Sequence, residues 1–426
     1  MVTLTPTVRW PLLAAVEVEL PVGLRDQDGR EIRIPRSLFV PTRAPEYTGL
    51  ITLREQLADA VVSVPSVNRS GDVLWSLTFS DEASRTGVQV TLYDAVSQQF
   101  VPRIVQEPIS VGSLGASGTI TDDGRVMAMW ALAAPEEIRA YESVGGGSWQ
   151  PLASLDDGSF FDRAPLVGLG DSGLAVAASN IGDFNTSDAN YLDLDDTRGW
   201  SSADSLLTAD RIIGVEPVGN DVLVFFENTG DGEIGAKRFS PNTPTNPDSI
   251  SVASSISARA PRFKRVPDDG AVGVWQNDQT GTLQTATYDN DRGAFEVEEF
   301  GAASTGGDLC LNTAGDRLVV WDDRGSTMAR YARSGEDWGP TEMVGISGAS
   351  VAPSCVLDEA GNGYAFYATP EGDAMTISVL LPSSNWQPFD TLEFIPARVT
   401  LTAADSFGAL SVFVAQAETA WVYRFE

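Results

Sequence analysis

The chain has 426 residues, 42% of them hydrophobic, and its 59 acidic and 28 basic side chains give a formal net charge of -31. This charge excludes nucleic acids and anionic lipid surfaces as partners, because long-range repulsion opposes their approach. Histidine is absent, which excludes Ser-His-Asp hydrolysis, histidine acid–base catalysis and histidine-bound zinc, copper or haem.

Residues 1–47 precede the repeats and are predicted to form an N-terminal extension. Val16–Leu20 and Arg30–Ile34 flank Asp26–Gly29, a pattern that predicts a β-hairpin with an Asp-Gly turn. Met1–Leu20 lacks the basic start and clean apolar stretch of a signal peptide. The composition favours an extracellular or periplasmic protein whose signal peptide is not in this chain, with a cytoplasmic protein as the alternative. No apolar run reaches the ~20 residues of a membrane span, so no membrane insertion is expected.

From residue 48 to the C-terminus the chain repeats a unit built on a glycine turn and a β-branched and aromatic run. Successive turn glycines are 45 to 53 residues apart, the length of a four-stranded propeller blade. The clear copies are Gly71–Trp75, Gly124–Trp130, Gly270–Trp275 and Gly315–Trp321, and weaker ones begin at Gly173, Gly219, Gly361 and Gly408. The spacing predicts an all-β fold, a single eight-bladed β-propeller over residues 48–426, with seven blades and an irregular insert as the alternative.

Each unit has the same order of strands. An inner strand precedes the glycine-led strand, a third strand ends on tyrosine, and a fourth opens on an aromatic residue such as Trp149, Trp200 or Trp338. These aromatic residues are predicted to pack between blades, and a stacking platform for sugars is the alternative. The last unit lacks its outer strand, and Gly49–Leu53 is predicted to fill that place and close the ring.

Cys310 and Cys355 lie on the inner strands of two successive units. Neighbouring inner strands line the same channel, so the two thiols could form an inter-blade disulfide in an oxidising compartment. Buried free cysteines, which behave as small core residues, are the alternative.

One loop carries a run of oxygen-bearing side chains. Asp183, Asn185 and Ser187 alternate, and Asp188 and Asp193 follow, a pattern typical of calcium ligands. The glycine of an EF-hand loop is missing, and Asp, Asn and Ser also favour turns, which is the alternative. No other cofactor is expected.

Four arginines stand at the start of inner strands, 8 to 11 residues before their turn glycines: Arg163, Arg211, Arg259 and Arg398. In a propeller these positions surround one mouth of the central channel. Converging guanidinium groups could bind a carboxylate, a sulfate or an acidic sugar through paired hydrogen bonds. The alternative is that each arginine pairs with an adjacent acid such as Asp162 or Asp210.

Two hairpins, Tyr93-Asp94 with Phe100 and Tyr288-Asp289 with Phe295, resemble the blades of exported bacterial propellers of the sialidase-like and lectin-like kinds. The full sialidase Asp-box is missing, and Ser334–Trp338 matches only its end. Asp195–Trp200 is similar to the tryptophan-docking hairpin of quinoprotein dehydrogenases, which have eight blades. The resemblance implies a fold and carries over no catalytic residue.

We therefore interpret the chain as a non-catalytic binding or scaffold propeller, monomeric, acting at the cell envelope or outside it on a protein or glycan ligand. The alternative is a glycan-processing enzyme that acts on an acidic sugar through carboxylates at the channel mouth. A cofactor-bearing quinoprotein is a third option.

Overall fold

The computed structural model is all-β, and the residues that it describes contain strands and no helix. None of these residues belongs to a helix long and apolar enough to cross a bilayer. For β1 to β4 and β33 to β35 only the backbone is described. The described residues are 15–19, 37–41, 47–55, 59–63, 66–68, 70, 72–81, 83–94, 97, 99–109, 113–133, 136–144, 147–155, 165–181, 186–194, 200–202, 210–228, 232–253, 258–266, 270–289, 292–348, 352–381, 385–392, 399–404, 410–416 and 419–425.

Four antiparallel sheets form the first half of the described chain. The first sheet contains β4 (Asp59–Val62), β5 (Ser66–Val67), β6 (Val73–Ser80), β7 (Thr86–Asp94) and β8 (Gln99–Ile109). The second contains β9 (Ser113–Ile120), β10 (Arg125–Ala133), β11 (Glu136–Val144) and β12 (Gln150–Pro151). The third contains β13 (Leu166–Leu169), β14 (Leu174–Ile181), β15 (Thr186–Asp193) and β16 (Ser201–Ser202). The fourth contains β17 (Asp210–Val218), β18 (Asp221–Asn228), β19 (Glu233–Phe239) and β20 (Asp248–Ala253).

Four further sheets follow in the same manner. The fifth contains β21 (Ala258–Val266), β22 (Gly270–Asn277), β23 (Thr282–Asp289) and β24 (Ala294–Ala302). The sixth contains β25 (Gly307–Leu311), β26 (Arg317–Asp322), β27 (Ser326–Ala332) and β28 (Glu342–Ile346). The seventh contains β29 (Ser354–Leu357), β30 (Gly363–Ala368), β31 (Met375–Leu380) and β32 (Gln387–Leu392). The eighth contains β33 (Val399–Ala404), β34 (Leu410–Gln416), β35 (Thr419–Phe425) and, from the other end of the chain, β3 (Tyr47–Glu55).

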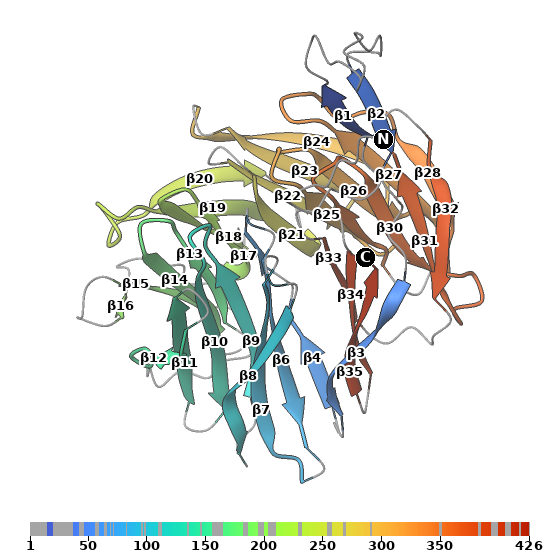
Figure 1. The fold of residues 1–426 in the computed structure, drawn as a ribbon. Coiled ribbons are helices and arrows are strands. Elements are labelled where there is room, and N and C mark those ends of the chain that lie inside the picture. Colours follow the sequence, from blue (N-terminus) through green and yellow to red (C-terminus); the bar gives the residue numbers. More distant parts are fainter. Residues whose placement is uncertain are drawn as a thin grey trace, which may run out of the picture.

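Neighbouring sheets contact one another mainly through the first strand of each, here called the inner strand. The contacts run from the first sheet to β9 and on through β13, β17, β21, β25, β29 and β33. The eighth sheet in turn contacts β4 of the first, and Figure 1 shows these two sheets side by side. Within the eighth sheet β3 pairs antiparallel with β35, so that Leu50 lies opposite Tyr423.

A separate two-stranded pair precedes these sheets. β1 (Ala15–Glu19) pairs antiparallel with β2 (Ser37–Pro41), and Val16 lies opposite Val40. The expected partner strand, Arg30–Ile34, lies outside the described residues. The observed partner is the uncharged run Ser37–Pro41, whose β-branched and aromatic residues favour a strand.

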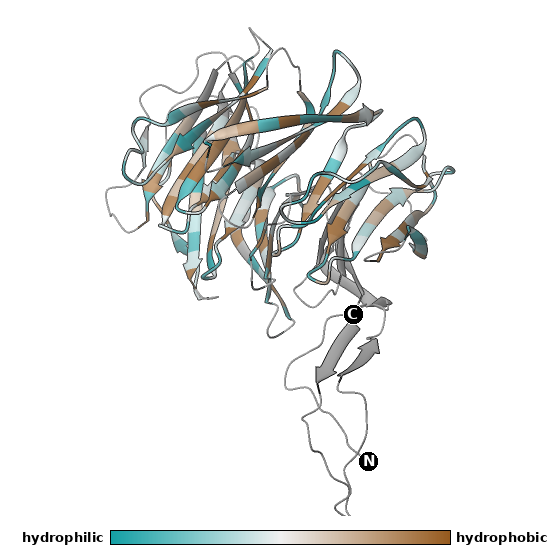
Figure 2. Ribbon diagram, turned by 90° about the horizontal axis from the view of Figure 1, so that it is seen from above, coloured by the Kyte–Doolittle hydropathy of each residue, from teal (hydrophilic) through white to brown (hydrophobic). Residues whose placement is uncertain are grey.

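The four tryptophans of the clear repeats form the centre of their sheets. Trp75, Trp130, Trp275 and Trp321 lie on the second strands and are at most 1% exposed. The second strand of the first sheet, β6, is buried along almost its whole length, because other sheets cover both of its faces. Outer strands such as β24 are largely exposed. Figure 2 shows the corresponding pattern, with apolar residues along the strands and polar residues at the turns.

The backbone conformation of the turn explains why glycine recurs at this position of the repeat. Gly124 has a φ of 80° and Gly315 a φ of 88°, a left-handed conformation that side chains with a Cβ rarely adopt. Each of these glycines ends the turn that joins an inner strand to the second strand.

Apolar clusters fill the spaces between sheets. One cluster joins the first two sheets through Leu74, Val90 and Val126, and Trp149 packs against it. Another joins the sixth and seventh sheets around Cys310 and Cys355. The aromatic residues that open the fourth strands, including Trp200, Trp338 and Trp386, pack against clusters of this kind.

Candidate functional site

Of the four arginines expected at the channel mouth, the structure describes Arg211 and Arg259, while Arg163 and Arg398 lie outside the described residues. Arg211 on β17 forms an ion pair with Glu227 on β18, its direct cross-strand partner. Its guanidinium also donates a hydrogen bond of 2.8 Å to the carbonyl of Ala258 on β21. Glu227 accepts a hydrogen bond from the backbone N–H of the same residue. Arg211 therefore fastens the fourth sheet to the fifth.

Arg259 follows Ala258 on β21 and is exposed. No hydrogen bond or ion pair joins its side chain to the described residues. Arg211, which is bonded to the protein, and Arg259, which is exposed, thus lie at the same end of neighbouring inner strands.

The opposite ends of the inner strands carry a charged cluster that the sequence analysis did not identify. Arg265 near the end of β21 donates two hydrogen bonds, of 2.9 and 3.4 Å, to the two carboxylate oxygens of Asp171. The same guanidinium lies 3.6 Å from a carboxylate oxygen of Asp122. Asp171 belongs to the turn between β13 and β14, and Asp122 to the turn between β9 and β10. One arginine of the fifth sheet thus reaches turns of the second and third sheets.

Glu216 on β17 faces this cluster. Burial raises the pKa of its carboxyl group to about 8. The positive charge of Lys264, a hydrogen bond from the backbone N–H of Arg265 and the charge of Arg265 all act in the opposite direction. Glu216 therefore keeps its proton at neutral pH, although part of its side chain remains exposed.

Cys310 on β25 and Cys355 on β29 form a disulfide with a Cα–Cα distance of 5.9 Å. Asp308 stands beside it and accepts hydrogen bonds from the Ser354 hydroxyl, at 3.0 Å, and from the Cys355 backbone N–H, at 3.1 Å. The disulfide and these hydrogen bonds join the inner strands of the sixth and seventh sheets.

The expected calcium ligands fall partly outside the described residues. Asp183 and Asn185 lie outside them, and for Ser187 and Asp188 only the backbone is described. The chain from Thr186 to Asp193 is strand β15, paired with β14, so the loop ends earlier than expected. Asp193 is exposed at the end of this strand. The calcium site stays a prediction.

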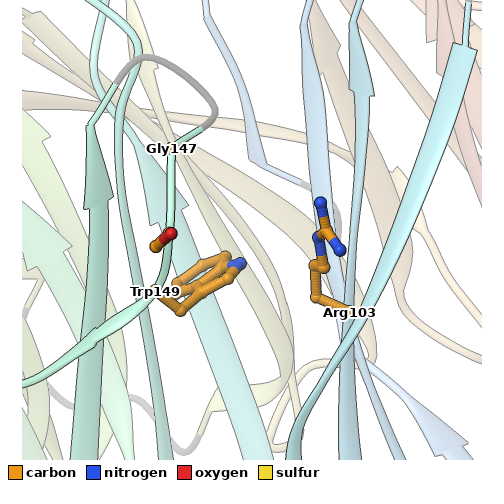
Figure 3. Close-up of a pocket in the computed structure, with 4 residues that line it drawn as sticks. Arg103, Gly147 and Trp149 are labelled. Atoms are coloured by element: carbon orange, nitrogen blue, oxygen red, sulfur yellow. The ribbon is translucent and has the colours of Figure 1, made fainter.

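A pocket of about 450 Å³ lies between the first and second sheets and is lined by Arg103, Gly147, Ser148 and Trp149. Arg103 is an exposed residue of β8, and the other three precede β12. Figure 3 shows the Trp149 ring beside Arg103, with the indole nitrogen on the side that faces the guanidinium group. Neither side chain has a hydrogen-bond or ion-pair partner among the described residues.

Two hydrogen bonds join Gly147, two residues before Trp149, to the end of β11. The Ser143 hydroxyl donates to the carbonyl of Gly147 at 3.0 Å, and the Gly147 N–H donates to the carbonyl of Val144 at 3.0 Å. Trp149 is half-buried against the apolar cluster between the two sheets. The pocket therefore has a fixed aromatic side and a polar side that can donate hydrogen bonds.

The corresponding space between the fifth and sixth sheets is filled. Arg317 lies over the ring of Trp338, 4.8 Å from its centroid. Arg103 lies three residues after the aromatic residue that opens its strand, Phe100, and Glu298 lies three residues after the equivalent Phe295. Glu298 forms an ion pair with Arg330 of the sixth sheet, with 2.7 Å between the charged atoms. In the second sheet Val126 stands where Arg317 stands in the sixth.

At the contact between the second and third sheets, the indole N–H has a hydrogen-bond partner within the protein. There the Trp200 indole N–H donates to the carbonyl of Ala153 at 2.8 Å. The sequence analysis noted Trp149 and missed Arg103. The feature of the sequence that could have identified Arg103 is its position three residues after Phe100. Other units have Leu152, Glu298 or Thr341 at the equivalent position.

No protein-family model and no curated protein matches the chain. Among solved structures it resembles the dihydro-heme d1 dehydrogenase NirN in complex with DHE, at 13% identity and a TM-score of 0.52, over 90% of this chain and 82% of that one. It also resembles the Dos1 propeller, at 9% identity and a TM-score of 0.54, over 89% and 95%. Dipeptidyl peptidase 4 of Porphyromonas gingivalis matches at 10% identity and a TM-score of 0.50, over 83% and 57%. At these identities the likeness shows the fold alone, which is that of a β-propeller.

Proposed function

We propose that this chain is a non-catalytic binding propeller that recognises a saccharide through the pocket between its first and second sheets. The observation that supports this proposal is the arrangement of Arg103 and Trp149, which face one pocket of about 450 Å³ without protein partners among the described residues. This volume lies within the usual range of small-ligand sites. An aromatic ring beside polar donors suits a sugar, whose C–H face stacks on the ring while its hydroxyls accept hydrogen bonds.

The proposal includes the form of the scaffold. We take the eight sheets as eight blades of one ring, residues 48–426, in which β3 completes the last blade beside β35. The sequence of contacts from β9 to β33 and the contact of β34 with β4 support this assignment. The residues before β3 form a separate extension in this proposal.

We further propose that the protein acts outside the cytoplasm, in the extracellular space or the periplasm. The disulfide between Cys310 and Cys355 supports this location, because structural disulfides persist in oxidising compartments.

A glycan-processing enzyme at the channel mouth is less well supported. That alternative requires free arginines beside a pair of carboxylates, and the Arg211 guanidinium is already bonded to Glu227 and to the Ala258 carbonyl.

The test is saccharide binding by two matched tryptophan variants. Trp149→Ala removes the ring that lines the pocket, and we expect it to lower the affinity of any saccharide found on a glycan array at least tenfold by calorimetry. Trp338→Ala removes the equivalent ring where Arg317 already covers it, and we expect unchanged affinity. Equal loss in both variants, or binding that survives Trp149→Ala, contradicts the proposed site.

A further inference from the structure

We propose that the ligand of this pocket is an acidic saccharide that carries one carboxylate on the sugar bound there. This inference rests on the proposed function and specifies its ligand. The carboxylate binds the Arg103 guanidinium, and the sugar ring lies against Trp149.

Arg103 differs from the other described arginines at contacts between sheets. Arginines at other contacts between sheets have partners: Arg211 binds Glu227 and Ala258, Arg265 binds Asp171, and Arg330 binds Glu298. Arg103 faces a pocket instead and has no such partner among the described residues. A planar guanidinium with free N–H groups matches a planar carboxylate through two parallel hydrogen bonds.

The indole N–H of Trp149 is a second hydrogen-bond donor at the pocket. In the third sheet the equivalent Trp200 N–H donates to a backbone carbonyl. The Trp149 nitrogen lies on the side that faces Arg103, so both donors serve the same space. A ligand that fills it must present acceptors and no donors at this point, and a carboxylate meets that condition better than a hydroxyl, which is donor and acceptor at once.

The charge of the whole molecule limits the charge of the ligand. A formal net charge of -31 repels anions, and this repulsion grows with each charge on the ligand. The pocket offers one guanidinium to compensate for it. The ligand therefore has a single acidic group at the bound sugar, next to neutral residues, and densely sulfated or polyuronic chains bind less well.

The experiment compares a disaccharide that ends in glucuronic acid with the methyl ester of the same disaccharide, by titration calorimetry in physiological salt. The two probes have the same ring and hydroxyls and differ in one charge. We expect the wild-type protein to bind the acid at least tenfold more tightly than the ester. Arg103→Gln should lower the affinity for the acid to about that for the ester and lower the affinity for the ester by a much smaller factor. Arg103→Lys keeps the charge, loses the paired hydrogen bonds and should fall between the two.

Arg259→Gln is the matched control, because Arg259 is also exposed but lies near the start of β21 in the fifth sheet, and we expect no change with this variant. Equal binding of acid and ester, or loss of acid binding in Arg259→Gln alone, overturns the inference. Binding of neutral array saccharides through Trp149 without binding of the acid also overturns it and leaves the proposed function standing. Failure of every saccharide to bind overturns both. Melting temperatures of the variants separate lost binding from lost folding.

Discussion

At the scale of single residues, the position of an arginine is less informative than the identity of its partners. Arg211 was expected at the channel mouth, and it belongs to a bond between two sheets. Its guanidinium pairs with Glu227, which lies directly opposite on β18. Cross-strand neighbours have Cβ atoms about 5 Å apart, whereas successive residues of a strand point to opposite faces. The sequence placed Arg211 at the start of an inner strand, as the structure does, and could not show that its partner is Glu227.

Glu216 gives a prediction about pH. Its pKa is about 8 in the folded chain against an ordinary value of 4.5, so the folded state holds a proton that the unfolded state releases. Stability from this group is therefore highest below about pH 4.5 and falls as the pH rises towards 8. We expect Glu216→Gln to raise the free energy of unfolding at pH 8 by about 1–3 kcal/mol, since each unit of pKa shift corresponds to ~1.4 kcal/mol and solvent at the exposed part reduces the effect.

The measurement is urea denaturation of both proteins at pH 4 and pH 8. At pH 4 the two should agree, because Glu216 is protonated in the folded and unfolded wild type. A glutamine variant that is equally stabilising at both pH values would show that its effect does not come from the proton.

At the scale of elements, the disulfide between the sixth and seventh sheets is expected to contribute to the stability of the fold. It joins β25 to β29 across 45 residues of chain, and closing a loop of that length in the unfolded state stabilises a protein by about 2–4 kcal/mol. We expect the double variant Cys310→Ala, Cys355→Ala to lose about that much in guanidinium denaturation. The control is the same comparison with a reductant present during unfolding, where most of the difference should disappear.

Strands were predictable from the sequence where a local pattern sets them. The glycine turns, the buried tryptophans and the order of strands within a unit follow from backbone conformation and apolar periodicity, and the described sheets agree with them. The pairing of β1 with β2 was not predicted, because the Asp-Gly turn signal directed attention to the run at 30–34, which lies outside the described residues. The pocket was not predictable, because Arg103 and Trp149 stand 46 positions apart and meet only when two sheets pack.

At the scale of the whole molecule, the pairing of β3 with β35 joins the two ends of the propeller chain. We predict that removal of residues 1–55 leaves the last sheet without an outer strand, exposes a sheet edge and yields a protein that aggregates or unfolds without a cooperative transition. Removal of residues 1–44 retains β3 and should leave the melting curve nearly unchanged. Circular dichroism and gel filtration of the two truncations make this comparison, and equal behaviour would mean that β3 does not complete the fold.

The difference between the contact at Trp149 and those at Trp200 and Trp338 also bears on how many ligands the proposed function would involve. Repetition of a blade could have produced a repeated site, with several equivalent pockets around the ring. In the residues that the structure describes, the Trp200 indole N–H is hydrogen-bonded to the Ala153 carbonyl and the Trp338 ring is covered by Arg317. Under the proposed function, the pocket at Trp149 is the open one of these three contacts. A single copy gains no avidity from a polymer that displays many copies of its ligand, so each binding event must depend on the fit of one sugar.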